Sequence, residues 1–102
     1  MRNITEANFQ THVLDAERPV LVDFYADWCG PCQNQLQVLS ELEREVHTSA
    51  DIVKVNVDEE QTLAREYGVR SIPTLILFTG GEAVETRIGV TPKQELTKLL
   101  NH

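Results

Sequence analysis

In the segment VLVDFYADWCGPCQNQL, residues 20–36, the pattern of apolar residues changes from that of a strand to that of a helix. This change is the main sequence evidence for the fold. The first part of the segment, residues 20–26, is a nearly continuous run of aliphatic and aromatic side chains, which is typical of a strand buried on both faces. After a Gly-Pro pair, leucines recur at helical spacing with charged residues between them, which predicts an amphipathic helix. The only two cysteines of the chain, Cys29 and Cys32, lie at this junction.

Two further strands, 51–57 and 73–78, are predicted from apolar runs bounded by turn residues. Gly80 and Gly81 follow the second run and are a hairpin signal, so residues 82–88 are predicted as the returning edge strand. The order strand, helix, strand implies parallel pairing through a right-handed crossover. The hairpin adds antiparallel strands, so we expect an α/β fold with a mixed sheet and helices on both faces.

The predicted helices each present an apolar face. These faces comprise Phe9 and Val13 in a short first helix, Leu36, Leu39, Leu42 and Val46 in the long helix, and Leu96, Leu99 and Leu100 in the last helix. Another short helix is expected over residues 62–67, where Gly68 is a suitable C-terminal stop.

Two helix starts are predicted from capping residues. Thr5 is expected to cap the first helix. Thr91 is expected to cap the last helix, with Pro92 at the first helical position and Gln94 completing a capping box.

Length and composition predict one domain, residues 1–102. Apolar residues make up 41% and charged residues 25%, the balance of an ordinary globular protein. The net charge of −7, with nine basic residues among sixteen acidic ones, argues against nucleic-acid binding. The absence of a long apolar run and of a signal-like start predicts a cytoplasmic protein that does not associate with membranes.

Cys29 and Cys32 are predicted to be a redox pair. A disulfide that closes so short a loop stabilises a fold little. The N-terminus of a helix carries unpaired N–H groups and partial positive charge, which stabilise the thiolate that attacks disulfides. We expect Cys29 to be exposed and to attack, and Cys32 to be more sheltered and to resolve the mixed disulfide, with Pro31 stiffening the turn.

The alternatives for this pair are a structural role and half of a zinc site. Zinc needs four ligands, which are commonly paired Cys and His residues. His12, His47 and His102 are isolated in the sequence and there is no second cysteine pair, so we expect no bound metal.

Residues 28–32, WCGPC, resemble the active-site signature of the thioredoxin family. Other landmarks of that family follow in the same order: residues 22–26, 54–58, 71–74 and 81–82. The resemblance covers essentially the whole chain. It implies the thioredoxin fold, in which a mixed five-stranded sheet is flanked by four helices.

The same resemblance implies a protein-disulfide reductase that needs no cofactor. Its partners would be disulfide-containing client proteins and a thioredoxin reductase that recharges it, and the protein would be a monomer. Two alternatives remain: a thioredoxin-fold binding or assembly module whose redox pair is dispensable, and an oxidase or isomerase of an oxidising compartment.

Asp23 interrupts the first apolar strand, where a carboxylate is costly unless it is paired or protonated. One interpretation is an Asp at a strand edge. The other is a buried carboxyl group with a raised pKa that exchanges a proton with Cys32. The resemblance implies the second role and makes Lys54, on the adjacent strand, its nearby cation. For Lys54 the alternative is an ordinary exposed lysine.

The resemblance assigns a client-binding surface to six residues: Trp28, Gly30, Pro31, Ile72, Pro73 and Gly89. It implies a cis Ile72-Pro73 bond that faces the cysteines and presents the Ile72 backbone to an extended client segment. Without the resemblance, Pro73 is an unremarkable first residue of a strand. Trp28 is likewise explained by packing in the core.

Five positions depart from the common thioredoxin pattern. Tyr25 replaces a frequent Trp, and Gln33 replaces a usual Lys or Arg. Asn34 and Gln35 stand where apolar residues are common, and Gln37 stands where a proline often kinks the helix. These changes leave the sulfur chemistry untouched and bear on partner choice, reduction potential and helix bend.

Overall fold

The computed structural model describes residues 1–101, and His102 lies outside the described residues. The described chain forms a mixed sheet of five strands in the order β1-β3-β2-β4-β5. The strands are β1 (Arg2–Asn3), β2 (Val20–Tyr25), β3 (Asp51–Asn56), β4 (Thr74–Thr79) and β5 (Glu82–Ile88). The strands β1, β3 and β2 are parallel, and β4 pairs antiparallel with both β2 and β5.

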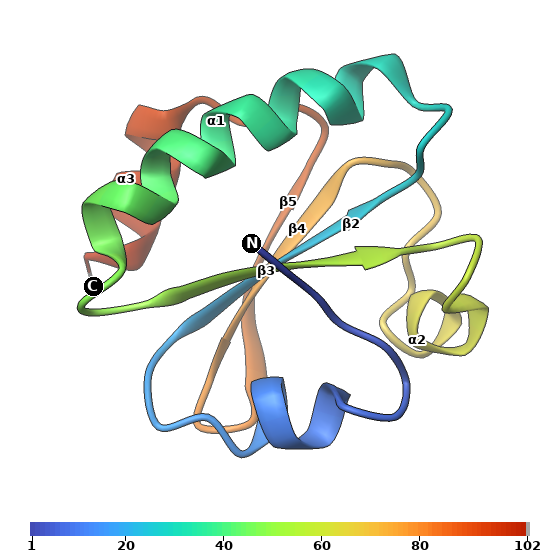
Figure 1. Cartoon of the computed structure of the whole chain (residues 1–102), viewed down its shortest axis with the longest axis horizontal. Coiled ribbons are helices and arrows are strands. Elements are labelled where there is room, and N and C mark those ends of the chain that lie inside the picture. The colour runs from blue at the N-terminus through green and yellow to red at the C-terminus, as the bar shows by residue number, and fades with distance from the viewer. Residues whose placement is uncertain (102) are drawn as a thin grey trace.

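Helices cover both faces of the sheet, as the sequence predicts (Figure 1). They are the π-helix η1 (Gln10–Leu14) and the α-helices α1 (Gly30–Val46), α2 (Gln61–Glu66) and α3 (Lys93–Leu100). The helices α1 and α3 lie on one face, and η1 and α2 lie on the other. The thioredoxin-type arrangement of four helices around a five-stranded sheet is therefore confirmed.

The sequence pattern predicts four of the five strands and misses β1. This strand has two exposed residues, so no apolar alternation marks it. Its only signature is backbone pairing, with Arg2 opposite Val53 and Asn3 opposite Lys54 on β3. Such a strand forms because the edge of the neighbouring strand β3 pairs with it, and its own side chains do not predict it.

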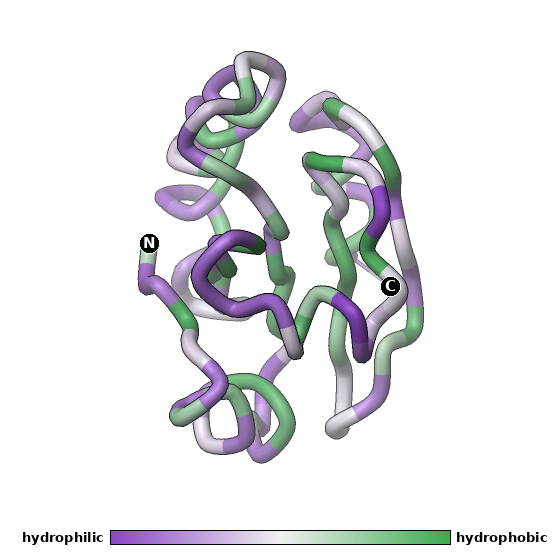
Figure 2. Tube along the Cα trace, turned by 90° about the vertical axis from the view of Figure 1, so that its right-hand side faces the viewer, coloured by the Kyte–Doolittle hydropathy of each residue, from purple (hydrophilic) through white to green (hydrophobic). Residues whose placement is uncertain are grey.

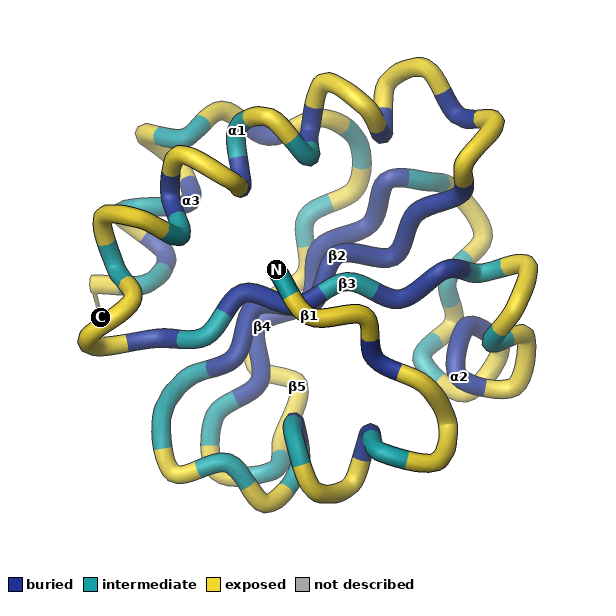
Figure 3. Tube along the Cα trace, in the orientation of Figure 1, coloured by how far each residue is buried: buried dark blue, intermediate teal, exposed yellow. Residues whose placement is uncertain are grey.

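Strand β2 divides the core. All six of its residues are buried (Figure 3), and successive side chains of a strand point to opposite faces of the sheet. The face under α1 and α3 contains Leu21, Leu39, Leu42, Ile52, Leu75, Leu77, Leu96 and Leu99. The opposite face contains Ile4, Phe9, Val13, Val20, Val22, Phe24, Val53, Val55, Leu63, Ile76 and Phe78. Figure 2 shows hydrophobic residues concentrated along the central strands and mostly hydrophilic residues in the peripheral turns.

Neither predicted threonine cap forms. Thr5 lies ahead of η1, where its backbone N–H donates to Asn8 Oδ1, and no side chain caps η1. The Thr91 hydroxyl donates to the Gly89 carbonyl at 3.1 Å, and Pro92 is the N-cap of α3 without a capping side chain. The Thr91 hydroxyl therefore bonds within the turn that precedes its helix, a local alternative that competes with capping.

At the N-terminal end of α1, the buried face of the helix differs from the predicted one by one residue. Leu36 is half-buried, whereas its neighbour Gln35 is completely buried. Leu39 and Leu42 are buried as expected. Residue 35 therefore faces the sheet, and a polar side chain occupies that position because it has specific partners, described below.

The hairpin between β4 and β5 turns through Gly80 and Gly81, whose φ angles are +59° and +84°. Thr79 and Glu82 pair across it, so the loop has the two residues of a tight hairpin. A Cβ atom at residue 81 would lie 3.0 Å from the carbonyl oxygen of Leu14, whereas residue 80 has open space. The turn is thus packed against the end of η1 on one side only.

We predict that Gly81→Ala destabilises the protein more than Gly80→Ala. Both substitutions place a side chain in the left-handed region, which costs about 1 kcal/mol. Gly81→Ala adds the close approach to the Leu14 carbonyl, for a total of about 3 kcal/mol. Urea unfolding of the two variants measures the difference, and equal midpoints would show that the turn is not packed against η1.

Candidate active site

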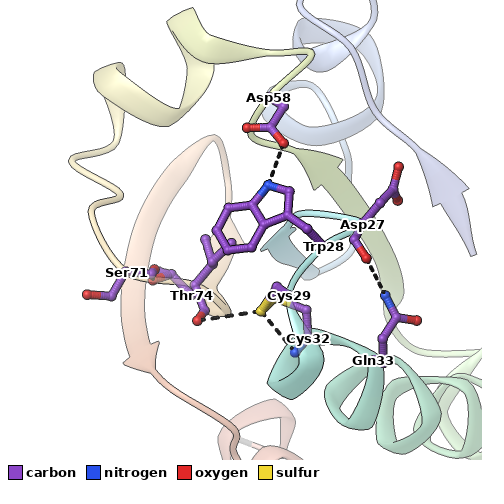
Figure 4. The surroundings of a disulfide bond; sticks show 9 residues. Asp27, Trp28, Cys29, Cys32, Gln33, Asp58, Ser71 and Thr74 are labelled. Atoms are coloured by element: carbon purple, nitrogen blue, oxygen red, sulfur yellow. Dashed lines mark hydrogen bonds between the residues drawn. A yellow bond between two sulfur atoms is a disulfide. The ribbon is translucent and has the colours of Figure 1, made fainter.

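The two cysteines lie at the start of α1 (Figure 4). Cys29 is the N-cap residue with an extended backbone, and Gly30 and Pro31 form the first helical positions. The Sγ atom of Cys29 accepts a hydrogen bond from the backbone N–H of Cys32 at 3.2 Å. The two residues form a disulfide, with their Cα atoms 5.2 Å apart. The sulfur of Cys29 thus occupies the place of a helix-capping oxygen and satisfies an otherwise unpaired N–H group.

Cys29 is less exposed than its sequence position suggests. Its exposed fraction is 5%, against 0% for Cys32. Cys29 is therefore more exposed than Cys32, as expected, but the expectation that Cys29 is openly exposed is wrong. Both cysteines pack in a small cluster with Tyr25 and Ala26, against which Ile72 also lies. Only a small part of Cys29 is therefore open to solvent.

The loop before β4 faces Cys29. The Ile72-Pro73 peptide bond is cis, as the resemblance implies, and the Ile72 carbonyl oxygen lies 3.9 Å from Cys29 Sγ. Two hydrogen bonds hold this loop: the Thr74 hydroxyl donates to the Ser71 carbonyl at 2.5 Å, and the Gly89 N–H donates to the Pro73 carbonyl at 2.8 Å. Ile72, Pro73 and Gly89, which are distant in sequence from the cysteines, are therefore brought together beside them, with Ile72 and Gly89 half-buried and Pro73 buried.

Trp28 lies on the outside of the site rather than in the core. Its exposed fraction is 72%, and its indole Nε1–H donates to Asp58 Oδ2 at 2.8 Å. The interpretation of Trp28 as a core residue is therefore wrong. An exposed aromatic ring held by one polar contact is suited to contact a partner protein. Val90 adds a second exposed apolar side chain in the segment that follows Gly89.

Asp58 is a site residue that sequence analysis did not single out, although it falls within a family landmark. It follows β3, and Trp28 follows β2, and these two strands are parallel neighbours. The carboxyl ends of parallel strands meet at the same sheet edge, so their following loops are adjacent. The parallel pairing that the sequence predicts for these two strands could have placed Asp58 beside Trp28.

Asp23 is completely buried, and among the described residues neither carboxylate oxygen has a hydrogen-bond partner. It is two residues from Leu21 on β2, so its side chain points to the sheet face that α1 covers. Burial raises the pKa of Asp23 from its ordinary value to about 7, and the positive charge of Lys54 opposes this by a smaller amount. The interpretation as a strand-edge residue is wrong.

Lys54 is Asp23's register partner on β3, and it is half-buried rather than fully exposed. Its Nζ atom lies 5.2 Å from the centre of the Tyr25 ring, a cation–π contact. The hydroxyl group of Tyr25 donates to Asn3 Oδ1 on β1 at 3.1 Å. Tyr25, a departure from the common Trp, therefore helps to hold the ammonium group beside the buried carboxyl group.

The comparisons with known proteins agree with this geometry. A protein-family model described as Thioredoxin matches residues 1–102. A thioredoxin of Pyropia yezoensis is 48% identical over 98 residues, which cover 96% of this chain and 92% of the relative. A thioredoxin of Rickettsia typhi is 41% identical over 101 residues, covering 99% and 96%, and "Thioredoxin 1" of Nostoc is 44% identical over 97 residues, covering 95% and 91%.

The fold and the dithiol at a helix N-terminus define a thiol–disulfide oxidoreductase. The chain belongs to the thioredoxin family. Thioredoxins act through a cysteine disulfide without a cofactor, and the activity of the Cys29–Cys32 pair is protein-disulfide reduction. Within residues 1–101, no group of three or more His, Cys, Asp or Glu residues could hold a metal ion, and no helix is long and apolar enough to cross a membrane.

We predict that Asp23→Asn is more stable than the wild type by a margin that widens with pH. The pKa of Asp23 is about 7 in the folded protein and below 4 when unfolded, so folding disfavours its ionised form and wild-type stability falls as pH rises through this range. The margin should grow by about 4 kcal/mol between about pH 4 and pH 9 and then stay constant.

Urea unfolding at a series of pH values measures this margin. Asp15→Asn is the matched control, because Asp15 is exposed and its substitution should change stability little. A margin for Asp23→Asn that is the same at both ends of the pH range would contradict the proposed burial of an ionisable carboxyl group.

Proposed function

We propose that Cys29 attacks disulfides of client proteins and that Cys32 resolves the product. The Cys29 thiolate attacks one client sulfur, forms a mixed disulfide and releases the other client sulfur as a thiolate. Cys32 then loses its proton, and its sulfur attacks Cys29 Sγ. The Cys29–Cys32 disulfide forms, the second client thiolate leaves, and two electrons have passed to the client.

The observation that carries this assignment is the place of Cys29 Sγ as the N-cap acceptor of α1. The Cys32 N–H donates to it, and the positive end of the helix dipole favours negative charge there. Cys32 lies one turn inside the helix with no exposed surface. A client sulfur can therefore reach Cys29 but not Cys32. The sulfur of Cys32 can react only with its neighbour Cys29.

We further propose that Asp23 accepts the proton of Cys32 during resolution, with Lys54 adjusting the charge near it. A base with a pKa close to the working pH exchanges protons most effectively, and burial gives Asp23 such a pKa, about 7. No hydrogen bond from a described residue occupies its oxygens, so they are available to a proton donor from α1.

The client-binding surface that we propose comprises Trp28, Gly30, Pro31, Ile72, Pro73 and Gly89. The Ile72 carbonyl lies 3.9 Å from Cys29 Sγ, so an extended client segment that pairs with the Ile72 backbone would place its own sulfur next to Cys29. The exposed ring of Trp28 lies beside Cys29, where its indole N–H bonds to Asp58.

We also propose that residues 1–102 act as one domain and a monomer, and that a thioredoxin reductase recharges the disulfide. The site needs residues from one chain alone, which supports the monomer. A dithiol that donates electrons must work where a reductant keeps it reduced, which supports the cytoplasm as its compartment.

We predict that the wild type accelerates reduction of insulin disulfides by dithiothreitol and that Cys29→Ser reacts at close to the uncatalysed rate. Cys32→Ser keeps the attacking sulfur but cannot resolve, so it should trap clients as mixed disulfides. Ser40→Ala, on an exposed position of α1, is the control and should match the wild type. Wild-type turnover in Cys29→Ser would reassign the nucleophile, and full biological function of a double cysteine variant would favour a binding module.

We predict a second effect of Asp23→Asn, on kinetics. Without the proton acceptor, the mixed disulfide should persist at least about tenfold longer at neutral pH, because Cys32 deprotonates more slowly. Acid quenching and mass measurement of the client adduct follow this lifetime. Asp15→Asn is again the control, and an unchanged lifetime in Asp23→Asn would remove Asp23 from the reaction.

A further inference from the structure

Gln35 is a buried amide that the reaction described above does not use. Its exposed fraction is 0%, which is unusual for glutamine. Its Nε2 donates to the Thr91 carbonyl at 3.0 Å, and its Oε1 accepts from the Thr91 N–H at 2.7 Å. One side chain of α1 therefore satisfies both backbone groups of a buried residue 56 positions away.

These two bonds belong to a series of hydrogen bonds that ends at Pro73, next to the Ile72 carbonyl that faces Cys29. The Thr91 hydroxyl donates to the Gly89 carbonyl at 3.1 Å, and the Gly89 N–H donates to the Pro73 carbonyl at 2.8 Å. Gly89 has a φ of +91°, so the backbone turns sharply at this point. Helix α1, the segment 89–91 and the loop before β4 are thus connected by hydrogen bonds on one side of Cys29.

We propose that Gln35 is a positioning residue that fixes the segment 89–91 against α1 and so sets the shape of the client-binding surface. This inference rests on the proposed function, because it assumes that clients contact Gly89 and the Ile72 backbone. Both hydrogen bonds of the Gln35 amide go to Thr91, so Gln35 acts through Thr91.

The chemistry of the amide explains why glutamine suits this position. The Thr91 backbone presents one donor and one acceptor, and Thr91 is only 5% exposed, so water cannot readily replace either partner. An apolar side chain would leave both groups unpaired, and an ionised carboxylate could accept but not donate. Asparagine carries the same amide on a side chain one methylene shorter.

The test compares Gln35→Met with Gln37→Met. Methionine matches the length of glutamine without its hydrogen bonds, and Gln37 is an exposed residue on the same helix. Three quantities are measured: hydrogen exchange of the Thr91 and Gly89 amides by NMR, the KM and kcat for insulin reduction, and the rate at which the reduced protein cleaves a small aromatic disulfide. Gln35→Asn replaces Gln35→Met if the latter does not fold.

In Gln35→Met we expect the Thr91 amide to exchange at least about tenfold faster, because its acceptor is lost. The KM for insulin should rise about fivefold, because a loosened segment must be ordered on binding. The value of kcat and the rate with the small disulfide should stay within about twofold, since the N-cap position of Cys29 is retained. Gln37→Met should match the wild type in all three.

An unchanged KM for insulin in a folded Gln35→Met with faster Thr91 exchange would overturn the inference, since the segment would then be loose without consequence for clients. An equal loss of rate with insulin and with the small disulfide would also overturn it, because Gln35 would then act on the cysteines. Failure of the wild type itself to reduce insulin would instead contradict the proposed function.

Discussion

The hydrogen bond from the Cys32 N–H to Cys29 Sγ is the interaction on which the function of this fold depends. It forms because the short connection that follows β2, the central and fully buried strand, ends at Cys29, the N-cap of α1. The strand fixes where the helix starts, and the helix start supplies donors and positive potential to one sulfur atom. A redox site on a mobile loop would lack this stabilisation of its thiolate.

Burial of Asp23 shows how stability and chemistry oppose each other in this protein. A carboxyl group without a hydrogen-bond partner among the described residues disfavours folding increasingly as it ionises. The same burial brings its pKa to about 7, where it can exchange a proton at neutral pH. Lys54, held near it by the Tyr25 ring and strand register, limits the rise in pKa without forming a hydrogen bond to it.

Periodicity predicted the buried strands and the helices, because these elements carry their own apolar patterns. The exposed strand β5 followed instead from the turn chemistry of Gly80 and Gly81. The same reasoning failed for β1, which is recognisable only by its pairing with β3. It also failed for the two caps: Thr5 lies ahead of η1, whose N-cap position is Phe9, and the Thr91 hydroxyl bonds to the Gly89 carbonyl instead. The sequence pattern predicted that Leu36 is buried, but Gln35 is buried instead. Hydrophobicity alone could not reveal that the Gln35 amide has a partner in the Thr91 backbone.

The sequence by itself determined the redox chemistry: two cysteines at the junction of a buried strand and a helix, with an Asp inside that strand. Only the tertiary structure decided what surrounds them. The approach of Ile72 and Gly89 to Cys29, the bond between Trp28 and Asp58, and the contact of Gln35 with Thr91 all join segments far apart in the chain. The physical reason is that local spacing sets which helix end holds a sulfur, whereas sheet order and packing set which loops meet there.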